Sequence, residues 1–282
     1  MNLYDYNTVN RILTSHGFTF SKALGQNFII DPDVCPSMAE ELCADDKTGA
    51  LEIGPGIGVL TKELCKVCKK VVSIELDKRL FPVLKETLGE FDNLEIVEGD
   101  VLKLNLREII KEKFSGMHSI KVCANLPYYI TSPVIMRLLE QKLPIDEIIV
   151  MVQKEAAERL TAEIGSRESG AVTVAVNYYA EAEMLFEVQK DCFYPAPKVD
   201  SAVIRLKIRK TPAVEVQNEE HFFKIVKAAF SQRRKTALNC LSNGLGVSKN
   251  KVSEALGIIG KDEKSRAENF TMQEFAQLSE IL

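Results

Sequence analysis

The sequence predicts an α/β fold with a mostly parallel sheet, followed by a small all-helical C-terminal domain. Two observations support this prediction. Over the first two thirds of the 282 residues, short apolar stretches alternate with amphipathic helical stretches, which is the pattern of a parallel sheet covered by helices on both faces. After about residue 210 the composition changes and only helical patterns follow.

Five apolar stretches are the predicted strands of the parallel sheet: residues 50–53, 71–75, 94–98, 121–124 and 147–152. The helices predicted between them are residues 59–65, 78–88, 106–113 and 132–139. Two further β-rich stretches, residues 182–188 and 201–208, have no clear helix between them. We therefore expect these two stretches to form an antiparallel hairpin at the edge of the sheet.

A linker and four helices make up the predicted C-terminal domain. The linker reads TPAVEVQNEE, and the helical stretches are residues 221–231, 235–243, 249–256 and 272–282. Asn243-Gly244, Gly257 and Gly260 separate the helical stretches, as glycine often does. The sequence thus predicts two domains, residues 1–210 with the sheet and residues 211–282 with the C-terminal helices.

The composition is that of a globular protein, with 46% hydrophobic and 27% charged residues. No apolar run approaches the roughly 20 residues that cross a bilayer, so we expect no membrane association. The first residues, MNLYDYNTVNRILTSHG, lack the apolar core of a signal peptide. Seven scattered cysteines suit a reducing compartment, and we expect a cytoplasmic protein.

The cysteines and histidines predict no metal site. Cys65 and Cys68 have metal-like spacing, but no second pair accompanies them, and zinc takes about four ligands. His16, His118 and His221 are far apart in the sequence and offer no evident triad.

A glycine-rich loop follows the first predicted strand, where residues 52–61 read EIGPGIGVLT. Gly54, Gly56 and Gly58 would let the backbone approach a ligand closely, and the N-terminus of the next helix favours anionic groups. A plain turn between strand and helix would also explain them. The dinucleotide fingerprint places its third glycine at position 59, where this chain has Val59, so the loop favours a different adenosine-containing cofactor.

Two acids end the next two predicted strands. Glu75 can accept hydrogen bonds from both hydroxyls of a ribose, and Asp100 can accept one from an adenine amine. Either acid alone is more often a solvated residue at a strand end. Combined with the glycine loop, the two acids match the two ends of an adenosine. The N-terminal run KALGQNFI, which contains Lys22 and Gln26, is polar and then apolar, as expected for a segment folded over a bound cofactor.

These motifs carry a family resemblance. EIGPGIG, SIELD, EGDVL and NLPYYITSP resemble, in order and spacing, the motifs of methyltransferases that use S-adenosylmethionine. With KALGQNF before them and FYPAPKVDS and FSQRRKTALN after them, they resemble the ribosomal RNA small-subunit adenine dimethyltransferases of the KsgA type over about residues 20–240. The resemblance implies a Rossmann-like methyltransferase fold. It also implies that the cofactor pocket is lined by Asn27, Ile29, Gly54, Glu75, Asp100 and Asn125.

The run Asn125-Leu126-Pro127-Tyr128 follows the fourth predicted strand. The N6 atom of adenine is a poor nucleophile because its lone pair is delocalised into the ring. The side-chain carbonyl of Asn125 and the backbone carbonyl of Leu126 could accept hydrogen bonds from its two N–H groups and so draw the nitrogen toward tetrahedral geometry. Pro127 keeps Leu126 extended and offers no N–H, Tyr128 can stack on the base, and Phe193 can cover the other face of the base.

A simpler explanation of this tetrad is a turn followed by a packing tyrosine. Enzymes that methylate protein glutamine or DNA adenine use similar tetrads, and Leu126 favours the RNA family. Tyr129 departs from the pattern, because relatives often carry a smaller polar residue there.

The net charge of −4 argues against a nucleic-acid partner until its distribution is considered. Residues 221–251 contain no Asp or Glu and seven basic residues: Lys224, Lys227, Arg233, Arg234, Lys235, Lys249 and Lys251. Such a run is often only a solvated helix face. Contact with phosphates needs a local basic surface rather than a basic protein, so the run predicts an RNA-binding surface in the C-terminal domain.

The sequence predicts transfer of methyl groups from S-adenosylmethionine to N6 of adenosine in ribosomal RNA. The resemblance implies two adjacent adenosines in the 3′-terminal hairpin loop of 16S rRNA, each dimethylated, in an assembling small subunit. The first domain would bind the cofactor and catalyse, and residues 211–282 would bind the RNA. A monomer is expected.

Two alternatives remain: a large-subunit rRNA adenine methyltransferase that confers antibiotic resistance, and a non-catalytic RNA-binding assembly factor. The PKVDS run and the C-terminal domain favour the small-subunit enzyme over the first. The intact tetrad and glycine loop argue against the second.

Overall fold

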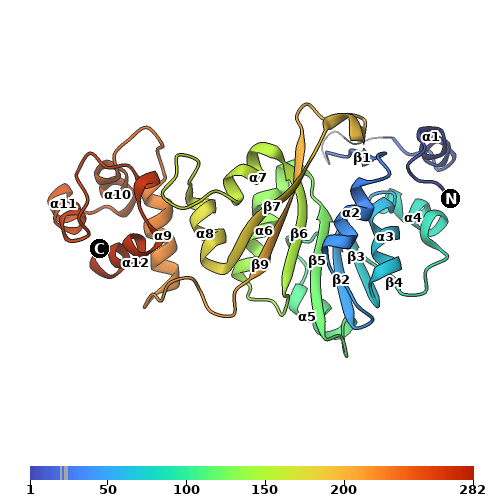
Figure 1. The fold of residues 1–282 in the computed structure, drawn as a ribbon, viewed down its shortest axis with the longest axis horizontal. Coiled ribbons are helices and arrows are strands. Elements are labelled where there is room, and N and C mark those ends of the chain that lie inside the picture. The colour runs from blue at the N-terminus through green and yellow to red at the C-terminus, as the bar shows by residue number, and fades with distance from the viewer. Residues whose placement is uncertain (20, 22–24) are drawn as a thin grey trace. The chain divides into compact units, whose positions relative to one another are not determined.

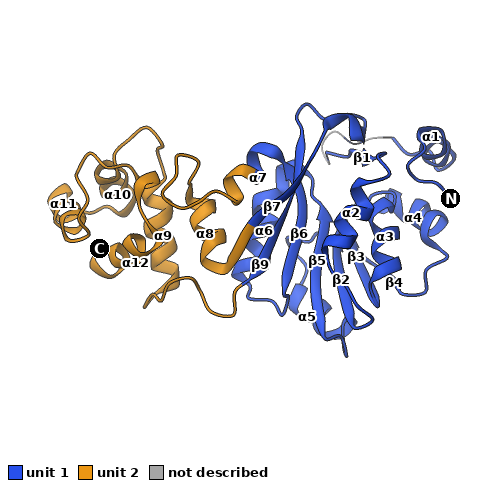
Figure 2. Cartoon of the chain, in the orientation of Figure 1, with its two compact units in different colours: residues 1–157, 183–208 blue, residues 158–182, 209–282 orange. Residues whose placement is uncertain are grey.

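The computed structural model describes residues 1–19, 21 and 25–282. Lys22, which we assigned to the cofactor-covering segment, lies outside the described residues. The chain forms two compact units (Figure 2): unit 1 is residues 1–157 and 183–208, and unit 2 is residues 158–182 and 209–282. Residues 158–182, which we expected in the first domain, group with residues 209–282, and the division into a catalytic and an RNA-binding domain stays a prediction.

A seven-stranded sheet with the order β4-β3-β2-β5-β6-β9-β7 forms the centre of unit 1 (Figure 1). Its strands are β2 (Thr48–Ile53), β3 (Lys70–Glu75), β4 (Leu94–Glu98), β5 (Ser119–Asn125), β6 (Glu147–Gln153), β7 (Ala180–Val188) and β9 (Ser201–Ile208). The first five pair in parallel, and β9 runs antiparallel to β6. The predicted α/β fold with a mostly parallel sheet is confirmed. From β2 the chain adds β3 and β4 on one side, and then returns to add β5 on the other side of β2. The strand order therefore reverses between β2 and β5, and ligands of open α/β sheets bind at such a switch point.

The two late strands occupy the predicted edge of the sheet. β9 lies between β6 and β7, and β7 is the edge strand. Only the 3₁₀ turn η4 (Lys190–Cys192) and the short strand β8 (Phe193–Tyr194) lie between β7 and β9 in the chain. β8 pairs with β1 (Phe28–Ile29) in a separate two-stranded sheet.

Some of the helices before the C-terminal region were predicted and others were not. Those matching predicted stretches are α3 (Val59–Val67), α4 (Phe81–Leu88), α5 (Leu106–Lys113) and α6 (Thr131–Glu140), with the 3₁₀ turn η2 (Lys78–Leu80) before α4. Those not predicted are α1 (Tyr6–Ser15), α2 (Val34–Glu41), α7 (Lys154–Leu160) and α8 (Ala171–Tyr179).

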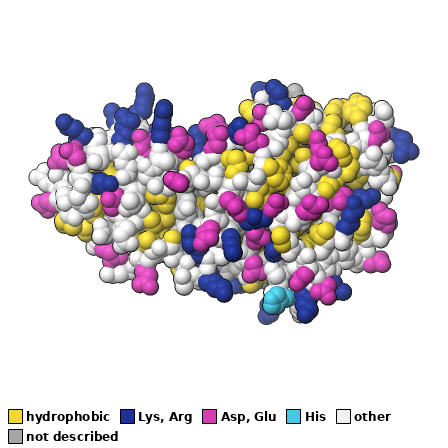
Figure 3. Space-filling view, viewed as in Figure 1, with side chains coloured by type: hydrophobic (Ala, Val, Ile, Leu, Met, Phe, Trp, Pro, Cys, Tyr) yellow, Lys and Arg dark blue, Asp and Glu magenta, His cyan; other side chains and the backbone are white. Residues whose placement is uncertain are grey.

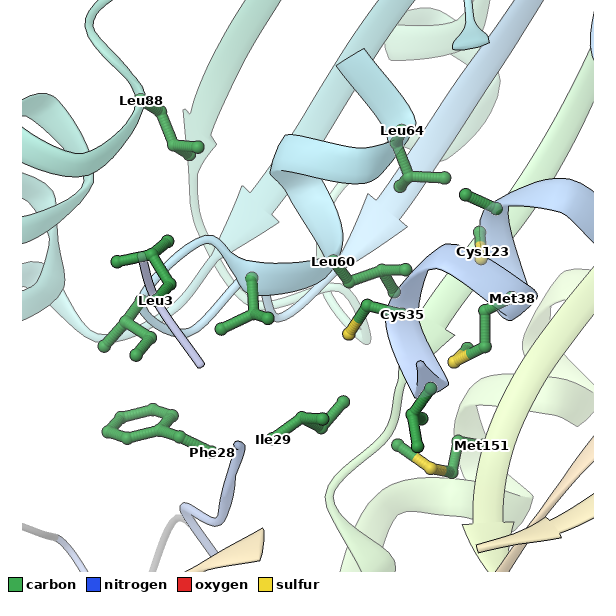
Figure 4. Packing of buried hydrophobic residues seen from close by; sticks show 14 of the residues in the cluster. Leu3, Phe28, Ile29, Cys35, Met38, Leu60, Leu64, Leu88, Cys123 and Met151 are labelled. Atoms are coloured by element: carbon green, nitrogen blue, oxygen red, sulfur yellow. The ribbon is translucent and has the colours of Figure 1, made fainter. Parts of the chain in front are cut away.

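The core of unit 1 lies between the sheet and helices that include α2, α3 and α4. Every residue of β2 is buried, as expected for a parallel strand covered on both faces. Figure 4 shows side chains from α2 and α3 meeting Phe28 and Ile29 of β1 in one apolar cluster. Leu3 belongs to the same cluster and is 2% exposed. The N-terminal residues are therefore part of the packing that supports β1.

Unit 2 contains α8 and the four C-terminal helices α9 (Glu219–Ala229), α10 (Ala237–Leu245), α11 (Lys249–Ile258) and α12 (Met272–Ile281). The predicted all-helical C-terminal region is confirmed. Phe222, Phe270 and Phe275 are fully buried in its core. Polar N-caps begin the helices: Thr236 caps α10, and Thr271 forms a capping box with Glu274 at the start of α12.

No helix in the part of the chain that the structure describes is long and apolar enough to cross a membrane. Within the same described residues, no cluster of three or more His, Cys, Asp or Glu could hold a metal ion.

Candidate functional site

The glycine loop lies at the carboxyl end of β2 and lines a cavity in unit 1. Gly54 has φ +71, and a Cβ added there would meet no described atom within 4 Å, so the backbone faces open space. Gly58, the N-cap of α3, has φ +93, and a Cβ there would lie 2.7 Å from Cδ1 of Leu88. The loop therefore needs glycine at position 58 for both its backbone conformation and its packing.

Both predicted strand-end acids line the same cavity. Glu75 ends β3 and is 6% exposed, and its Oε1 accepts a hydrogen bond from the Asp77 N–H at 2.7 Å. Burial raises the pKa of Glu75. Asp100 follows β4, and its Oδ1 accepts a hydrogen bond from the Leu102 N–H at 2.9 Å. Backbone donors thus fix both carboxylates at the strand ends.

A third carboxylate, which sequence reasoning missed, lines the cavity at Glu52 of β2. It is 1% exposed, and Ser73 Oγ donates a hydrogen bond of 2.6 Å to its Oε2. Burial raises the pKa of Glu52 to about 7. The described lining contains three acids and no Lys or Arg, so the cavity favours a ligand that carries positive charge.

The N-terminal segment from Gly25 to Ile29 covers part of the cavity, as predicted for a segment folded over a cofactor. Asn27 and Ile29 are among its lining residues. Gln26 Nε2 donates a hydrogen bond of 2.9 Å to Asp77 Oδ2, which ties the segment to the end of β3. The pairing of β1 with β8 places Ile29 opposite Phe193, so the segment lies beside the FYPAP loop.

The tetrad begins with Asn125, the last residue of β5. The Leu126 N–H donates a hydrogen bond of 3.2 Å to the Met151 carbonyl, and the Leu126 side chain is 1% exposed. Among the residues that the structure describes, none forms a hydrogen bond with the Asn125 side chain or with the Leu126 carbonyl oxygen. The side-chain carbonyl of Asn125 and the backbone carbonyl of Leu126 are therefore available to accept hydrogen bonds from a ligand. Asn125, Leu126 and Pro127 all line the cavity.

Three aromatic residues complete the lining. Tyr128 is half-buried at the start of the 3₁₀ turn η3 (Tyr128–Ile130). Phe193 is 3% exposed, and Tyr129 is 54% exposed. A Cβ added at Gly25 would lie 3.6 Å from the ring of Tyr129, so this ring packs on the N-terminal segment at the cavity mouth.

The comparisons with known proteins identify the family. The family model described as ribosomal RNA adenine dimethylase matches residues 17–282. The chain belongs to the ribosomal RNA adenine dimethylase family. It is an S-adenosylmethionine-dependent methyltransferase, as the motifs predicted.

Similar curated relatives cover nearly the whole chain. A ribosomal RNA small subunit methyltransferase A from Bacillus pumilus (strain SAFR-032) is 47% identical over 274 residues, which are 96% of this chain and 94% of the relative. A protein of the same name from Geobacillus thermodenitrificans (strain NG80-2) is 48% identical over the same shares.

Solved structures share the fold. The 23S rRNA methyltransferase ErmE is 27% identical with a TM-score of 0.67, covering 90% of this chain and 99% of that one. A dimethyladenosine transferase from Plasmodium falciparum is 24% identical with a TM-score of 0.70, covering 89% of this chain and 95% of that one. The predicted Rossmann-like methyltransferase fold is confirmed.

The predicted RNA-binding residues of this dimethylase lie in unit 2. Lys224 and Lys227 are on α9, and Arg233, Arg234 and Lys235 lie between α9 and α10. All of them, with Lys249 and Lys251, are exposed, and none lies in an ion pair with a described Asp or Glu side chain. Lys251 Nζ donates a hydrogen bond of 3.2 Å to an oxygen of the C-terminal residue Leu282. Figure 3 shows dark blue side chains gathered along the upper edge of the C-terminal helices. The other lysines and arginines of this group therefore carry positive charge that no described Asp or Glu side chain pairs with.

Proposed function

We propose that this dimethylase transfers methyl groups from S-adenosylmethionine to N6 of two adjacent adenosines in the 3′-terminal hairpin loop of 16S rRNA, and dimethylates each. It acts in the cytoplasm, as a monomer, on the assembling small subunit. Residues 1–210 carry the cofactor site and the chemistry, and residues 211–282 bind the RNA. The small subunit is favoured because the curated relatives at 46–48% identity are named small subunit methyltransferases.

The observation that carries this proposal is the meeting of all the predicted cofactor and base residues around one cavity. Segments far apart in the sequence, from Asn27 to Phe193, supply its lining. The glycine loop, the two strand-end acids and the tetrad were singled out from the sequence, and the family resemblance implied Asn27 and Ile29; a chance set of strand ends and loops would not converge in this way. Their convergence supports one site for both cofactor and adenine.

The cavity residues fit the cofactor. Glu75 would accept the ribose hydroxyls, Asp100 would accept the adenine amine, and the open backbone at Gly54 leaves space beside the glycine loop. The acidic, cation-free lining that the structure describes suits a sulfonium. When bound, the cofactor supplies an electrophilic methyl group.

The tetrad would bind and orient the target adenine. The Asn125 side-chain carbonyl and the Leu126 backbone carbonyl accept hydrogen bonds from the two N–H groups of N6. This draws the nitrogen toward tetrahedral geometry and turns its lone pair away from the ring. Tyr128 and Phe193 cover the two faces of the base, so the adenine must first leave its stack in the RNA. Alignment and fixed dipoles then provide most of the rate. The proton that N6 loses after methylation is acidic and passes to water or a carbonyl, so no strong protein base is needed.

Labelled cofactor and purified ribosomal subunits test the proposal. We expect label in N6,N6-dimethyladenosine from the 3′-terminal hairpin of the small subunit, and none from the large subunit. Label confined to the large subunit would favour the antibiotic-resistance activity. Label on neither subunit would favour an RNA-binding assembly factor.

The basic surface is tested by charge reversal. The double variant Arg233→Glu, Arg234→Glu should weaken binding to small-subunit RNA and lower the salt dependence of the binding constant by about 0.7–0.9 per lost phosphate contact. The double variant Lys111→Glu, Lys207→Glu is the matched control, because both lysines are exposed in unit 1 and the net charge changes equally. An unchanged salt dependence in the arginine variant would remove this surface from the RNA interface.

A further inference from the structure

The Tyr128 hydroxyl is bound by a buried serine from a distant part of the chain. The hydroxyl oxygen lies 2.8 Å from Oγ of Ser201, and the two hydroxyls share a hydrogen bond. Ser201 is 0% exposed and is the first residue of β9, where it pairs with Gln153 on β6. It belongs to the PKVDS run, to which the proposed cofactor and base contacts give no role.

The position of Ser201 is fixed from both sides. Its neighbour Asp200 accepts a hydrogen bond from the Lys190 N–H at its Oδ1, at 3.0 Å. The Asp200 carbonyl accepts another from the Lys154 N–H, also at 3.0 Å. The start of β9 is thus bound to the end of β6 and to the turn η4. A hydroxyl held this firmly can orient whatever it binds.

We infer that Ser201 is a positioning residue for the Tyr128 ring. At its backbone end the ring is fixed by Pro127 and the turn η3, and at its hydroxyl end by Ser201. Without the second attachment the ring can move between staggered rotamers about its Cα–Cβ bond, and each such move would carry the hydroxyl away from Ser201. With it, one ring face is presented to the cavity. The inference rests on the proposed function only for the claim that this face stacks on the target adenine.

Kinetics of three variants test the consequence for transfer. Tyr128→Phe keeps the ring and removes the hydroxyl, Ser201→Ala removes the partner, and the third variant combines both. Each single variant should lower kcat on small subunits by about 3- to 10-fold, the range of one neutral hydrogen bond, with an unchanged cofactor Kd. The double variant should be no slower than the slower single variant, because both changes remove the same interaction.

Wild-type kcat in either single variant, or multiplicative losses in the double variant, would overturn the inference. If thermal melting shows that Ser201→Ala is unfolded, the Tyr128→Phe rate alone decides, and a wild-type rate there counts against positioning.

A readout independent of activity separates this inference from the proposed function. In protein labelled with 3-fluorotyrosine, the ¹⁹F resonance of Tyr128 is the one missing from the Tyr128→Phe variant. We expect the resonance to report one rotamer about the Cα–Cβ bond in the wild type and exchange between rotamers about this bond in Ser201→Ala. An identical Tyr128 resonance in both proteins would overturn positioning even if methylation occurs as proposed. A wild-type protein that methylates no subunit refutes the proposed function and leaves this measurement valid.

Discussion

Replacing Asn125 by alanine tests the proposed activation of N6 most directly. Backbone pairing with Met151 fixes the end of β5, so the strand should stay in place when the side chain is truncated. No described residue forms a hydrogen bond with the Asn125 side chain, so no protein group loses a partner. The whole effect should therefore fall on the ligand. Removing one preorganised hydrogen-bonding group from an active site lowers kcat by about 10²–10³-fold, or about 2.7–4 kcal/mol.

Single-turnover methylation of small subunits at saturating cofactor measures this loss, and calorimetry measures the cofactor Kd, which should rise only modestly. Asn105→Ala is the matched control. Asn105 caps α5 by accepting a hydrogen bond from the Glu108 N–H, so its loss should cost about 1 kcal/mol of stability without changing kcat. An Asn125→Ala enzyme within 10-fold of the wild-type rate would refute the role assigned to the tetrad.

Three further outcomes are expected at the cavity. Glu75→Gln should weaken cofactor binding by about 10- to 100-fold, because a neutral amide replaces a charged acceptor; calorimetry with unchanged affinity would exclude the ribose contact. Gly58→Ala should lower the free energy of unfolding by more than about 1 kcal/mol, since its φ is +93 and Leu88 blocks a Cβ; denaturant titration checks this. Burial raises the pKa of Glu52 from 4.5 to about 7 in the folded state, so the folded protein binds the proton more tightly than the unfolded chain does. The free energy of unfolding should therefore fall as the pH rises from 4.5 to about 7, by up to about 3 kcal/mol. In Glu52→Gln that part of the fall should be absent, and an unchanged pH dependence would contradict the assignment.

The strands of the sheet were the most predictable part of the fold. Parallel strands buried on both faces, such as β2, are short continuous apolar runs. The bounds were also predictable at β4 and at the antiparallel β9, which have the same bounds as the predicted residues 94–98 and 201–208. Helix α8 was the opposite case. Its sequence AVTVAVNYY is rich in β-branched and aromatic residues, which favour strands. It is helical in unit 2 because Val174, Val176 and Tyr178 are buried there, and burial overrides local propensity.

The candidate site divides in the same way. Glu75, Asp100 and Asn125 could be predicted because polar residues at the carboxyl ends of parallel strands meet at one edge of a sheet. Glu52 could not, because an acid inside an apolar strand gives no sign of whether it faces a cavity. The Ser201 contact could not either. It joins residues 73 positions apart and exists only because β9 returns to pair antiparallel with β6.

The acidic lining has a cost that a cationic ligand removes. Burial raises the pKa of both Glu52 and Glu75, which means that their ionised forms are disfavoured in the cavity without a ligand. The described lining provides no Lys or Arg to offset this cost. A sulfonium bound nearby favours the ionised carboxylates, and the neutral thioether left after transfer does not. We therefore propose that the buried carboxylates lower the affinity for the neutral product relative to the cationic cofactor.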